Sequence, residues 1–288
     1  MDWLFDAITG WMKGMMIDGI MSNMTSMFEL INDEVQTTAV RVGMTPADFS
    51  PRVFAMIRGI SETVILPIAG IILTFVCCWE LIQMIMEHNN MANFEISLIF
   101  KWIMKTFVAV VIVSNTFNIT MAVFDVAHHV IASSGGLITE STAVTEADLE
   151  ALRANLESLG LGELTGLFFE MFVIEISLAL ISICVFVVIY GRMIEIYLMT
   201  SLAPIPFATF GNHEQSQIGQ NYLRSLFALG FQGFLIMVCV GIYAVLIHGI
   251  TVTDNIHASL WGILGYTVLL CFTLFKTGSL AKGIFSAH

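Results

Sequence analysis

The chain has 288 residues, of which 57% are hydrophobic and only 12% are charged. A water-soluble domain carries about 25% charged residues. The shortage of charge, with a mean hydropathy of +0.86, excludes an ordinary soluble domain and a disordered chain. The 11 basic and 23 acidic side chains give a formal net charge of −12, which argues against a surface that grips nucleic acid, because such a surface needs clustered Lys and Arg. A lipid bilayer is the solvent that fits this composition.

The first 58 residues form an amphipathic helical region. Apolar residues recur there at steps of three and four, from Leu4 through Trp11 to Ile31, and acidic and polar residues fill the opposite face. This period is typical of a helix with one apolar face. Because the helix is net acidic, we expect it to dock on protein rather than on anionic lipid. We expect no cleaved signal peptide, because no apolar core is followed by a small-residue cleavage site.

Five later segments are apolar over the ~20 residues needed to cross the hydrocarbon layer of a bilayer. They cover residues 60–86, 96–123, 167–190, 223–247 and 260–280. The predicted fold is therefore an all-α, polytopic membrane helix bundle. Its parts are an N-terminal amphipathic helical region at 1–58, transmembrane helices 1 and 2 at 59–124, an external acidic loop at 125–166, and the remaining spans with a cytoplasmic C-terminus at 167–288.

The external loop is expected to contain one short helix. Its acidic residues include Glu146, Asp148 and Glu150, and leucines at 149, 152, 156 and 159 give it one apolar face. Thr145 resembles a helix start, and Gly160 is expected to end the helix.

A sixth apolar stretch, residues 192–211, carries two prolines. Pro204 and Pro206 remove amide donors and clash with the preceding turn, so a straight helix through both is not expected. Because the residue before a proline favours extended backbone, we expect the helix to break between Ala203 and Pro206. Arg192 and Glu195 lie three residues apart before this break. The stretch is predicted to be a broken or re-entrant element, or a helix near the cytoplasmic interface.

Basic residues near the ends of the spans set the orientation of a membrane protein. Beyond residue 100, six of them fall on one side if residues 192–211 do not cross: Lys101, Lys105, Arg192, Arg224, Lys276 and Lys282. That side should be the cytoplasm, which puts the N-terminus outside and the C-terminus inside. In this orientation the basic residues before position 60 lie outside, although basic residues usually lie on the cytoplasmic side. A crossing at 192–211 would instead give six spans.

Polar groups within the spans form a candidate intramembrane polar face made of Lys105, Asn115, Glu170 and Glu175. Charged groups in hydrocarbon usually face the interior of a helix bundle, so these residues could line a conduit or an assembly seam. The alternative is interhelical pairing, for example between Lys105 and Glu175, or Lys side chains reaching to the interface.

Motifs for catalysis and cofactor binding are not found in the sequence. His213 and Glu214 begin a zinc-protease pattern that fails at Gln217, and Asp125 with the two following histidines lacks further ligands at suitable spacing. No nucleophile elbow, P-loop or dinucleotide-binding motif occurs. We therefore expect neither an enzyme nor a cofactor or metal.

An arginine, Arg192, is followed by an aromatic-containing helix and then by the Ala-Pro-Ile-Pro turn at 203–206. This segment resembles the TrbL-type conjugal transfer family. Members of this family, also called the "VirB-six" class, are polytopic membrane-channel subunits of type IV secretion systems. The segments 219–224 and 230–233 and the plan of about five spans resemble the same family. The similarity covers residues 60–282. Within the family, the sequence resembles the forms carried by integrative mobile elements of Gram-positive bacteria.

This resemblance implies a channel or scaffold subunit that passes a DNA–relaxase substrate across the membrane. The expected partners are further copies of the chain, other secretion subunits including ATPases, and the bilayer. A complex of single-stranded DNA and protein is expected to pass through transiently, without tight binding of the nucleic acid. A secondary transporter or small-solute channel is the competing interpretation. It is disfavoured because transporters often carry paired broken helices and only one strong break stands out. An intramembrane enzyme is disfavoured by the missing motifs.

Overall fold

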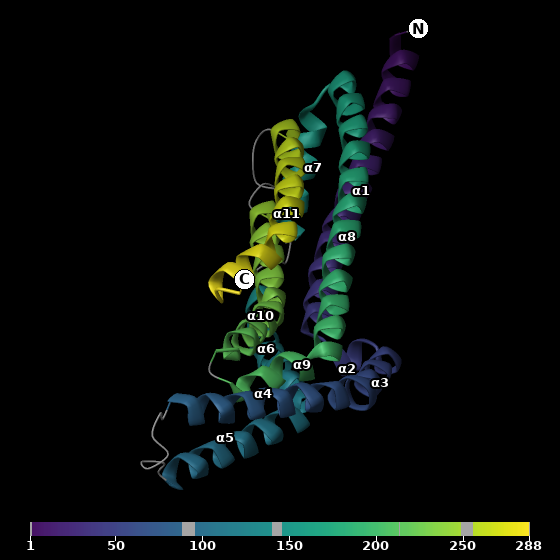
Figure 1. Ribbon diagram of the computed structural model, residues 1–288. Coiled ribbons are helices and arrows are strands. Elements are labelled where there is room, and N and C mark those ends of the chain that lie inside the picture. Colours follow the sequence, from purple (N-terminus) through teal and green to yellow (C-terminus); the bar gives the residue numbers. More distant parts are fainter. Residues whose placement is uncertain (1, 88–95, 140–145, 213, 249–255, 288) are drawn as a thin grey trace. The chain divides into compact units, whose positions relative to one another are not determined.

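The structure is a computed structural model that describes residues 2–87, 96–139, 146–212, 214–248 and 256–287. It is 95% helical, and the described residues contain no strand, so the all-α prediction is confirmed (Figure 1). The helices are α1 (Asp2–Gly43), α2 (Pro46–Phe49), α3 (Pro51–Ile60), α4 (Leu66–Glu87), α5 (Ile96–Ser114), α6 (Thr116–Thr139), α7 (Glu146–Ser158), α8 (Leu161–Leu202), α9 (Pro204–Ala208), α10 (Ser216–His248) and α11 (Ile256–Ile284). A π-helical turn (Ser61–Ile65) joins α3 to α4, and a 3-10 turn (Thr209–Gly211) follows α9.

Five helical segments of the described chain are long and apolar enough to cross a membrane, as expected. They are Pro51–Met86, Ile96–Ser114, Leu161–Leu202, Ser216–Ile247 and Ile256–Ile284. In four of these segments, only 11% to 28% of the residues in the most apolar stretch are buried inside the protein, whereas the share is 56% in the segment formed by α10. Their exposed side chains are mostly large and apolar, so these faces require lipid or further protein around them.

The chain folds as two compact units. Unit 1 comprises residues 1–42, 131–189 and 235–277, and unit 2 comprises 43–130, 190–234 and 278–288. The boundaries between the units fall inside helices α6, α8, α10 and α11. The division into four consecutive segments describes expected membrane topology and stays a prediction.

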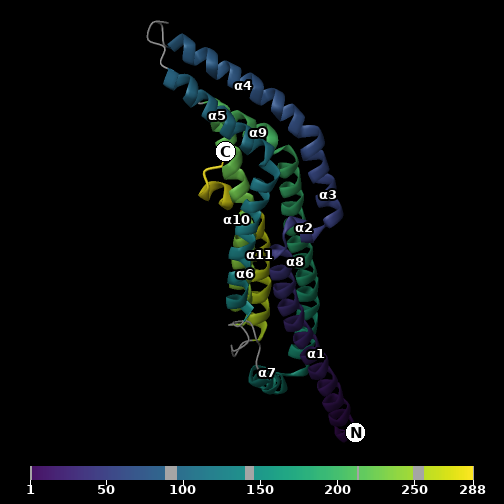
Figure 2. The same cartoon turned by 90° about the horizontal axis from the view of Figure 1, so that it is seen from below.

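Unit 1 is built on α1 and the first part of α8, which lie side by side (Figures 1 and 2). A Cβ atom on Gly19 of α1 would lie 3.9 Å from the ring of Phe168 of α8. The short α7 is bonded to α1, because Arg153 donates to Asp18 at 2.9 Å and Lys13 donates to the Glu157 carbonyl at 2.8 Å. The predicted short helix is thereby confirmed, while its expected start at Thr145 lies outside the described residues.

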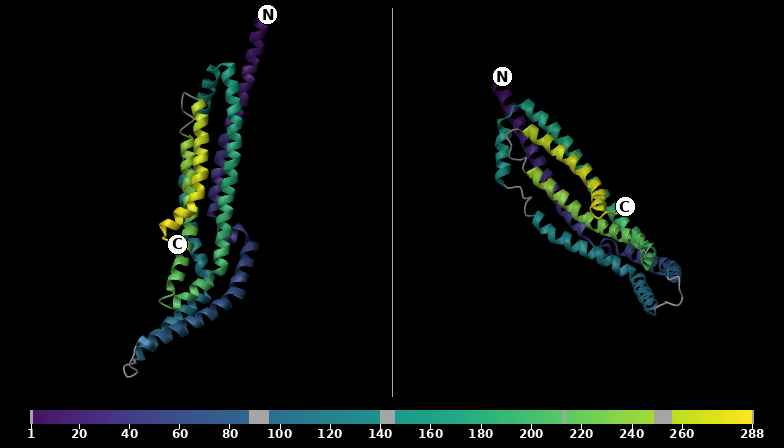
Figure 3. Two further views of the ribbon diagram at one scale, coloured as in Figure 1. Left: turned by 45° about the horizontal axis from the view of Figure 1, so that its top comes forward. Right: turned by 60° about the vertical axis from the view of Figure 1, so that its left-hand side comes forward.

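The rest of unit 1 comes from the end of α6 and from the neighbouring segments of α10 and α11 (Figure 3). Tyr243 of α10 and Thr267 of α11 share a hydrogen bond of 3.2 Å between their hydroxyl groups. The largest fully buried side chains of unit 1 are all Ile, Leu and Met, including Ile20, Met27, Leu156, Leu164, Leu167, Met171 and Ile236. Apolar contact between regular helices therefore supplies most of the packing in this unit.

Unit 2 contains a hairpin of α4 and α5, which run side by side (Figures 1 and 2). The indole nitrogen of Trp102 donates to the Cys77 carbonyl at 3.1 Å. A continuous apolar cluster joins this hairpin to α3, α6, α9 and to the segments of α8 and α10 in the unit. Its members are Ile57, Ala69, Leu73, Cys77, Ala109, Val113, Val123, Phe124, Met193, Ile196, Tyr197, Ala203, Phe207, Ala208, Leu226 and Leu229.

The second predicted span, residues 96–123, is two helices. Asn115 separates α5 from α6, and its side-chain amide donates to the Val111 carbonyl at 2.8 Å, while the Thr116 hydroxyl donates to the Val113 carbonyl at 2.8 Å. Polar side chains that bond preceding carbonyls compete with the regular helix, and two successive residues do so at this interruption. Helix α6 then continues to Thr139, into residues expected to be loop. Ser and Gly are only weak helix formers, and they do not end a helix as proline does.

Candidate functional site

The proline-containing stretch begins as an uninterrupted continuation of α8. Helix α8 runs over 42 residues to Leu202, and Arg192 and Glu195 lie within it rather than in a separate element. The helix ends where expected, because Ala203 separates α8 from α9, which starts at Pro204. The interruption predicted from Pro204 and Pro206 is therefore present at the predicted residues.

The backbone at the interruption differs from the expected one. Ala203 has φ −49° and ψ −40°, which is helical rather than extended. Pro204 occupies the first position of α9, where proline is well accommodated because that amide has no helical partner. Ala203 is completely buried, and its small side chain fits among the packed neighbours of the turn. The chain thus changes from one helix to the next without an extended segment.

The two prolines leave backbone carbonyls of α8 without their usual partners, because neither proline has an amide hydrogen. The Ala203 amide reaches the Thr200 carbonyl at 3.4 Å. The Ser61 hydroxyl, from the π-helical turn, donates to the same carbonyl at 3.5 Å. The Tyr222 hydroxyl, from α10, donates to the Met199 carbonyl. Side chains from two other elements therefore bond two of the carbonyls at the helix break, those of Met199 and Thr200.

Close backbone packing continues beyond α9. A Cβ atom on Gly219 would lie 2.8 Å from the Pro206 carbonyl oxygen, so only glycine fits there without a shift. Thr209 links the same segments, since its hydroxyl donates to the Pro206 carbonyl at 2.7 Å and accepts from the Gly219 amide at 3.2 Å. The turn after the prolines is thereby fixed against the start of α10.

Arg192 is buried in unit 2, with 6% of its surface exposed. Its guanidinium donates to the carbonyls of Leu229 and Gly230 in α10, at 3.0 and 3.1 Å. A Cβ atom on Gly233 would lie only 2.7 Å from two of the guanidinium atoms, so the absence of a side chain at Gly233 makes room for Arg192. Glu195, which was predicted to share this element, is exposed.

The four residues of the candidate polar face are distributed over both units. Lys105 pairs with Glu80 at 2.5 Å across the α4–α5 hairpin, which takes the place of the suggested pair with Glu175. Asn115 bonds within its own helix turn. These two residues belong to unit 2, whereas Glu170 and Glu175 belong to unit 1.

Glu170 meets a partner that the sequence did not suggest. Its carboxylate lies 2.9 Å from Nδ1 of His257, near the start of α11. Glu175 lines a cavity of unit 1. Between Glu175 and Arg192 no charged residue occurs in α8, and this uncharged run is about 24 Å long at ~1.5 Å per residue. The acidic residues and Arg192 thus mark opposite ends of the apolar part of α8.

Within the described ranges, no three His, Cys, Asp or Glu side chains gather in a way that could hold a metal ion. The site consists instead of a helix break, a buried arginine and the aromatic and hydroxyl groups that fasten them. These groups hold the helices of unit 2 in position.

Residues 31–204 match the family described as "TrbL/VirB6 plasmid conjugal transfer like protein". The matched region covers more than half of the chain. The protein belongs to this TrbL/VirB6 family. No curated protein and no solved structure matches the chain.

Membership of the TrbL/VirB6 family confirms the resemblance recognised at Arg192 and the Ala-Pro-Ile-Pro turn, and it points to a multi-pass conjugal-transfer membrane protein of type IV secretion. The matched region contains Arg192 and extends as far as Pro204. The residues that complete the site from α10, Tyr222 and Gly233, lie beyond it. Members of the family are structural channel components, in keeping with a site that positions helices.

Proposed function

We propose that this protein is a channel or scaffold subunit in the cytoplasmic membrane of a conjugative type IV secretion system, where it assists the translocation of a DNA–relaxase substrate. The observation that carries the proposal is the family match over residues 31–204. Five apolar helical segments support it, since a channel subunit must span the bilayer. The contacts at the helix break also support it, because backbone carbonyls freed at a break in a membrane helix need other partners.

Several copies of the chain surround the transfer path in this proposal, together with ATPases and other subunits of the secretion system. The exposed apolar faces of four of the five segments support this arrangement, because helices in membranes associate through well-packed surfaces. The net charge of −12 supports transit without tight binding, because a strongly basic wall would retain the phosphate backbone of the DNA.

The proposed orientation puts the N-terminus outside and the C-terminus in the cytoplasm. The distribution of charge along α8 supports it: Glu170 and Glu175 precede the uncharged run and Arg192 follows it, and basic residues favour the cytoplasmic side. Variants with a single cysteine at position 150, 215 or 288 test this orientation. We expect an impermeant thiol reagent added outside to label only position 150. Labelling of 215 and 288 from outside would contradict the orientation.

One observation favours the second candidate, a secondary transporter or small-solute channel. The π-helical turn at Ser61–Ile65 is a second backbone irregularity, and its Ser61 bonds the Thr200 carbonyl at the proline interruption. Transporters often place paired broken helices around a substrate site. A transporter, unlike a secretion subunit, would show saturable uptake of a solute by the purified protein alone.

The decisive experiment is deletion of the gene from a conjugative element, followed by complementation with the intact chain. We expect the frequency of DNA transfer to collapse in the deletion strain and to return on complementation, with the protein co-purifying with secretion ATPases as an oligomer. Unchanged transfer in the deletion strain would refute the proposed function. A monomer that catalyses saturable solute uptake in vesicles would establish the alternative.

A further inference from the structure

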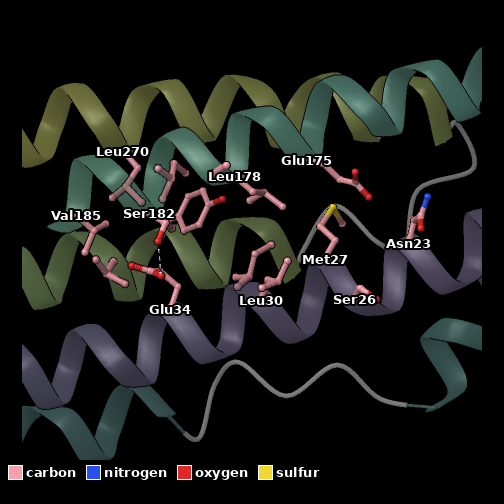
Figure 4. A pocket seen from close by; sticks show the side chains of 15 residues that line it. Asn23, Ser26, Met27, Leu30, Glu34, Glu175, Leu178, Ser182, Val185 and Leu270 are labelled. Carbon is pink, nitrogen blue, oxygen red and sulfur yellow. Dashed lines mark hydrogen bonds between the residues drawn. The ribbon is translucent and has the colours of Figure 1, made fainter.

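Unit 1 contains a cavity of about 370 Å³ between helices α1, α8, α10 and α11 (Figure 4). Small-molecule sites in proteins commonly have volumes of roughly 300–1,000 Å³ and largely apolar walls. Most of this wall is apolar, with Met27 and Leu30 from α1 and Leu178 from α8. The cavity is therefore large enough for a small organic molecule, and its lining belongs entirely to one unit.

Two carboxylates interrupt the apolar wall. Glu34 extends from α1 and Glu175 from α8, and no basic residue lines the cavity. The Ser182 hydroxyl donates to Glu34 at 3.0 Å and so holds that carboxylate in place (Figure 4). Within the described part of the chain Glu175 has neither a hydrogen-bond nor an ion-pair partner. The cavity thus offers negative charge to an occupant.

The surroundings reinforce this charge. Unit 1 holds four basic and fifteen acidic residues, whereas unit 2 holds seven basic and eight acidic residues. Nearly all of the net negative charge of the chain therefore lies in the unit that contains the cavity. A carboxylate next to apolar surface is attracted more strongly to a cation than it would be in bulk water.

An aromatic ring completes the wall. Tyr243 of α10 lines the cavity, and its hydroxyl group is held by the hydrogen bond to Thr267. Aromatic rings attract quaternary ammonium groups through the negative face of the π system. Apolar side chains, two carboxylates and an aromatic ring together suit a molecule with one positive charge on an apolar body.

We propose that this cavity binds a monovalent organic cation with an apolar body, of the quaternary ammonium class. The ammonium group interacts with Glu175, and the apolar body contacts Met27, Leu30 and Leu178. Because the ammonium group lies against Glu175 of α8 and the apolar body contacts Met27 and Leu30 of α1, the bound cation joins these helices and stabilises unit 1. The site is separate from the proline interruption and does not depend on the proposed role in conjugation.

Benzyltrimethylammonium is a suitable probe, and neopentylbenzene is its neutral isostere, with carbon in place of nitrogen. Binding of each is measured by equilibrium dialysis against the purified full-length protein in lipid nanodiscs. We expect saturable binding of the cation and binding at least about tenfold weaker in Glu175→Gln, the factor that corresponds to ~1.4 kcal/mol. The neutral isostere should bind both proteins equally.

Glu150→Gln is the matched control, because it removes an exposed carboxylate of unit 1 that does not line the cavity. It should leave binding of the cation unchanged. Leu178→Trp keeps both carboxylates and fills the cavity, so it should abolish binding of both probes. The proposal is overturned if the cation shows no saturable binding, if Glu175→Gln binds it as tightly as the intact protein, or if Leu178→Trp has no effect.

Discussion

The two units of this protein hold their helices together in different ways. Unit 1 packs regular helices through Ile, Leu and Met side chains and carries a large excess of acidic residues. Unit 2 has nearly balanced charge and contains the proline interruption, whose carbonyls receive hydrogen bonds from Ser61 and Tyr222. Regular helices need only matching apolar faces, whereas broken helices in a membrane need particular polar partners. Substitutions in unit 2 should therefore have larger and more specific effects than comparable substitutions in unit 1.

The largest effect on stability is expected for Gly233→Ala in unit 2. The added methyl group would meet the guanidinium of Arg192 at about the 2.7 Å found for an ideal Cβ, and Arg192 is held by two backbone carbonyls. Overpacking in a buried site costs about 1–3 kcal/mol. We expect the thermal unfolding midpoint of the purified protein to fall clearly.

Gly265→Ala in unit 1 is the control for this substitution. Gly265 lies in α11, and an ideal Cβ atom there meets nothing within 4 Å. Alanine is a better helix former than glycine by up to about 1 kcal/mol, so this variant should be as stable as the intact protein or slightly more so. Equal midpoints for Gly233→Ala and Gly265→Ala would contradict the contrast between the units.

A smaller effect is expected when the hydroxyl groups that serve the interruption are removed. Tyr222→Phe removes one hydrogen bond to the Met199 carbonyl, and Ser61→Ala removes one to the Thr200 carbonyl. A typical intramolecular hydrogen bond contributes about 0.5–1.5 kcal/mol, so Tyr222→Phe should lose about that much. Ser61→Ala should lose less, because the 3.5 Å contact of Ser61 is long for a hydrogen bond. Tyr266→Phe, in α11, should leave the unfolding midpoint unchanged, because the Tyr266 hydroxyl makes no hydrogen bond within the described residues.

The smallest effect is expected for the ion pairs. A double-mutant cycle with Lys105→Met and Glu80→Gln should give a coupling of about 0.5 kcal/mol, because the two side chains remain 41% and 17% exposed. The corresponding cycle for Arg153 and Asp18 in unit 1 should give a coupling near zero, since those side chains are 54% and 70% exposed. A larger coupling in unit 1 than in unit 2 would reverse the expected order.

Much of the fold could be predicted from the sequence because the signals are local. Runs of apolar residues located the five spans, the leucine spacing located α7, and the two prolines located the end of α8. Local rules also produced the errors. The preference of a residue before proline for extended backbone did not hold at Ala203, where tertiary packing favours a helical turn. The polar residues near Asn115 were taken as part of one span, although they separate two helices.

The partners at the candidate site could not be predicted in the same way. Ser61 and Thr200 lie 139 residues apart, and nothing in a single sequence indicates that contact. The same holds for Glu80 as the partner of Lys105 and for His257 as the partner of Glu170. Gly233 lies in the segment 230–233, for which a resemblance to the family was expected but which lies beyond the matched residues 31–204. Its role in making room for Arg192 depends on the packing of α8 against α10.

The measurement that tests the account most directly is the frequency of conjugal transfer by the double variant Pro204→Ala, Pro206→Ala. Alanine restores both amide hydrogens, so α8 can continue through residues 203–206. Both prolines lie in the first turn of α9, where proline is tolerated, and alanine is a better helix former, so the variant should insert in the membrane and accumulate as the intact protein does. We predict that its transfer frequency falls toward that of the deletion strain despite normal accumulation. Normal transfer by this variant would contradict the functional role assigned to the interruption.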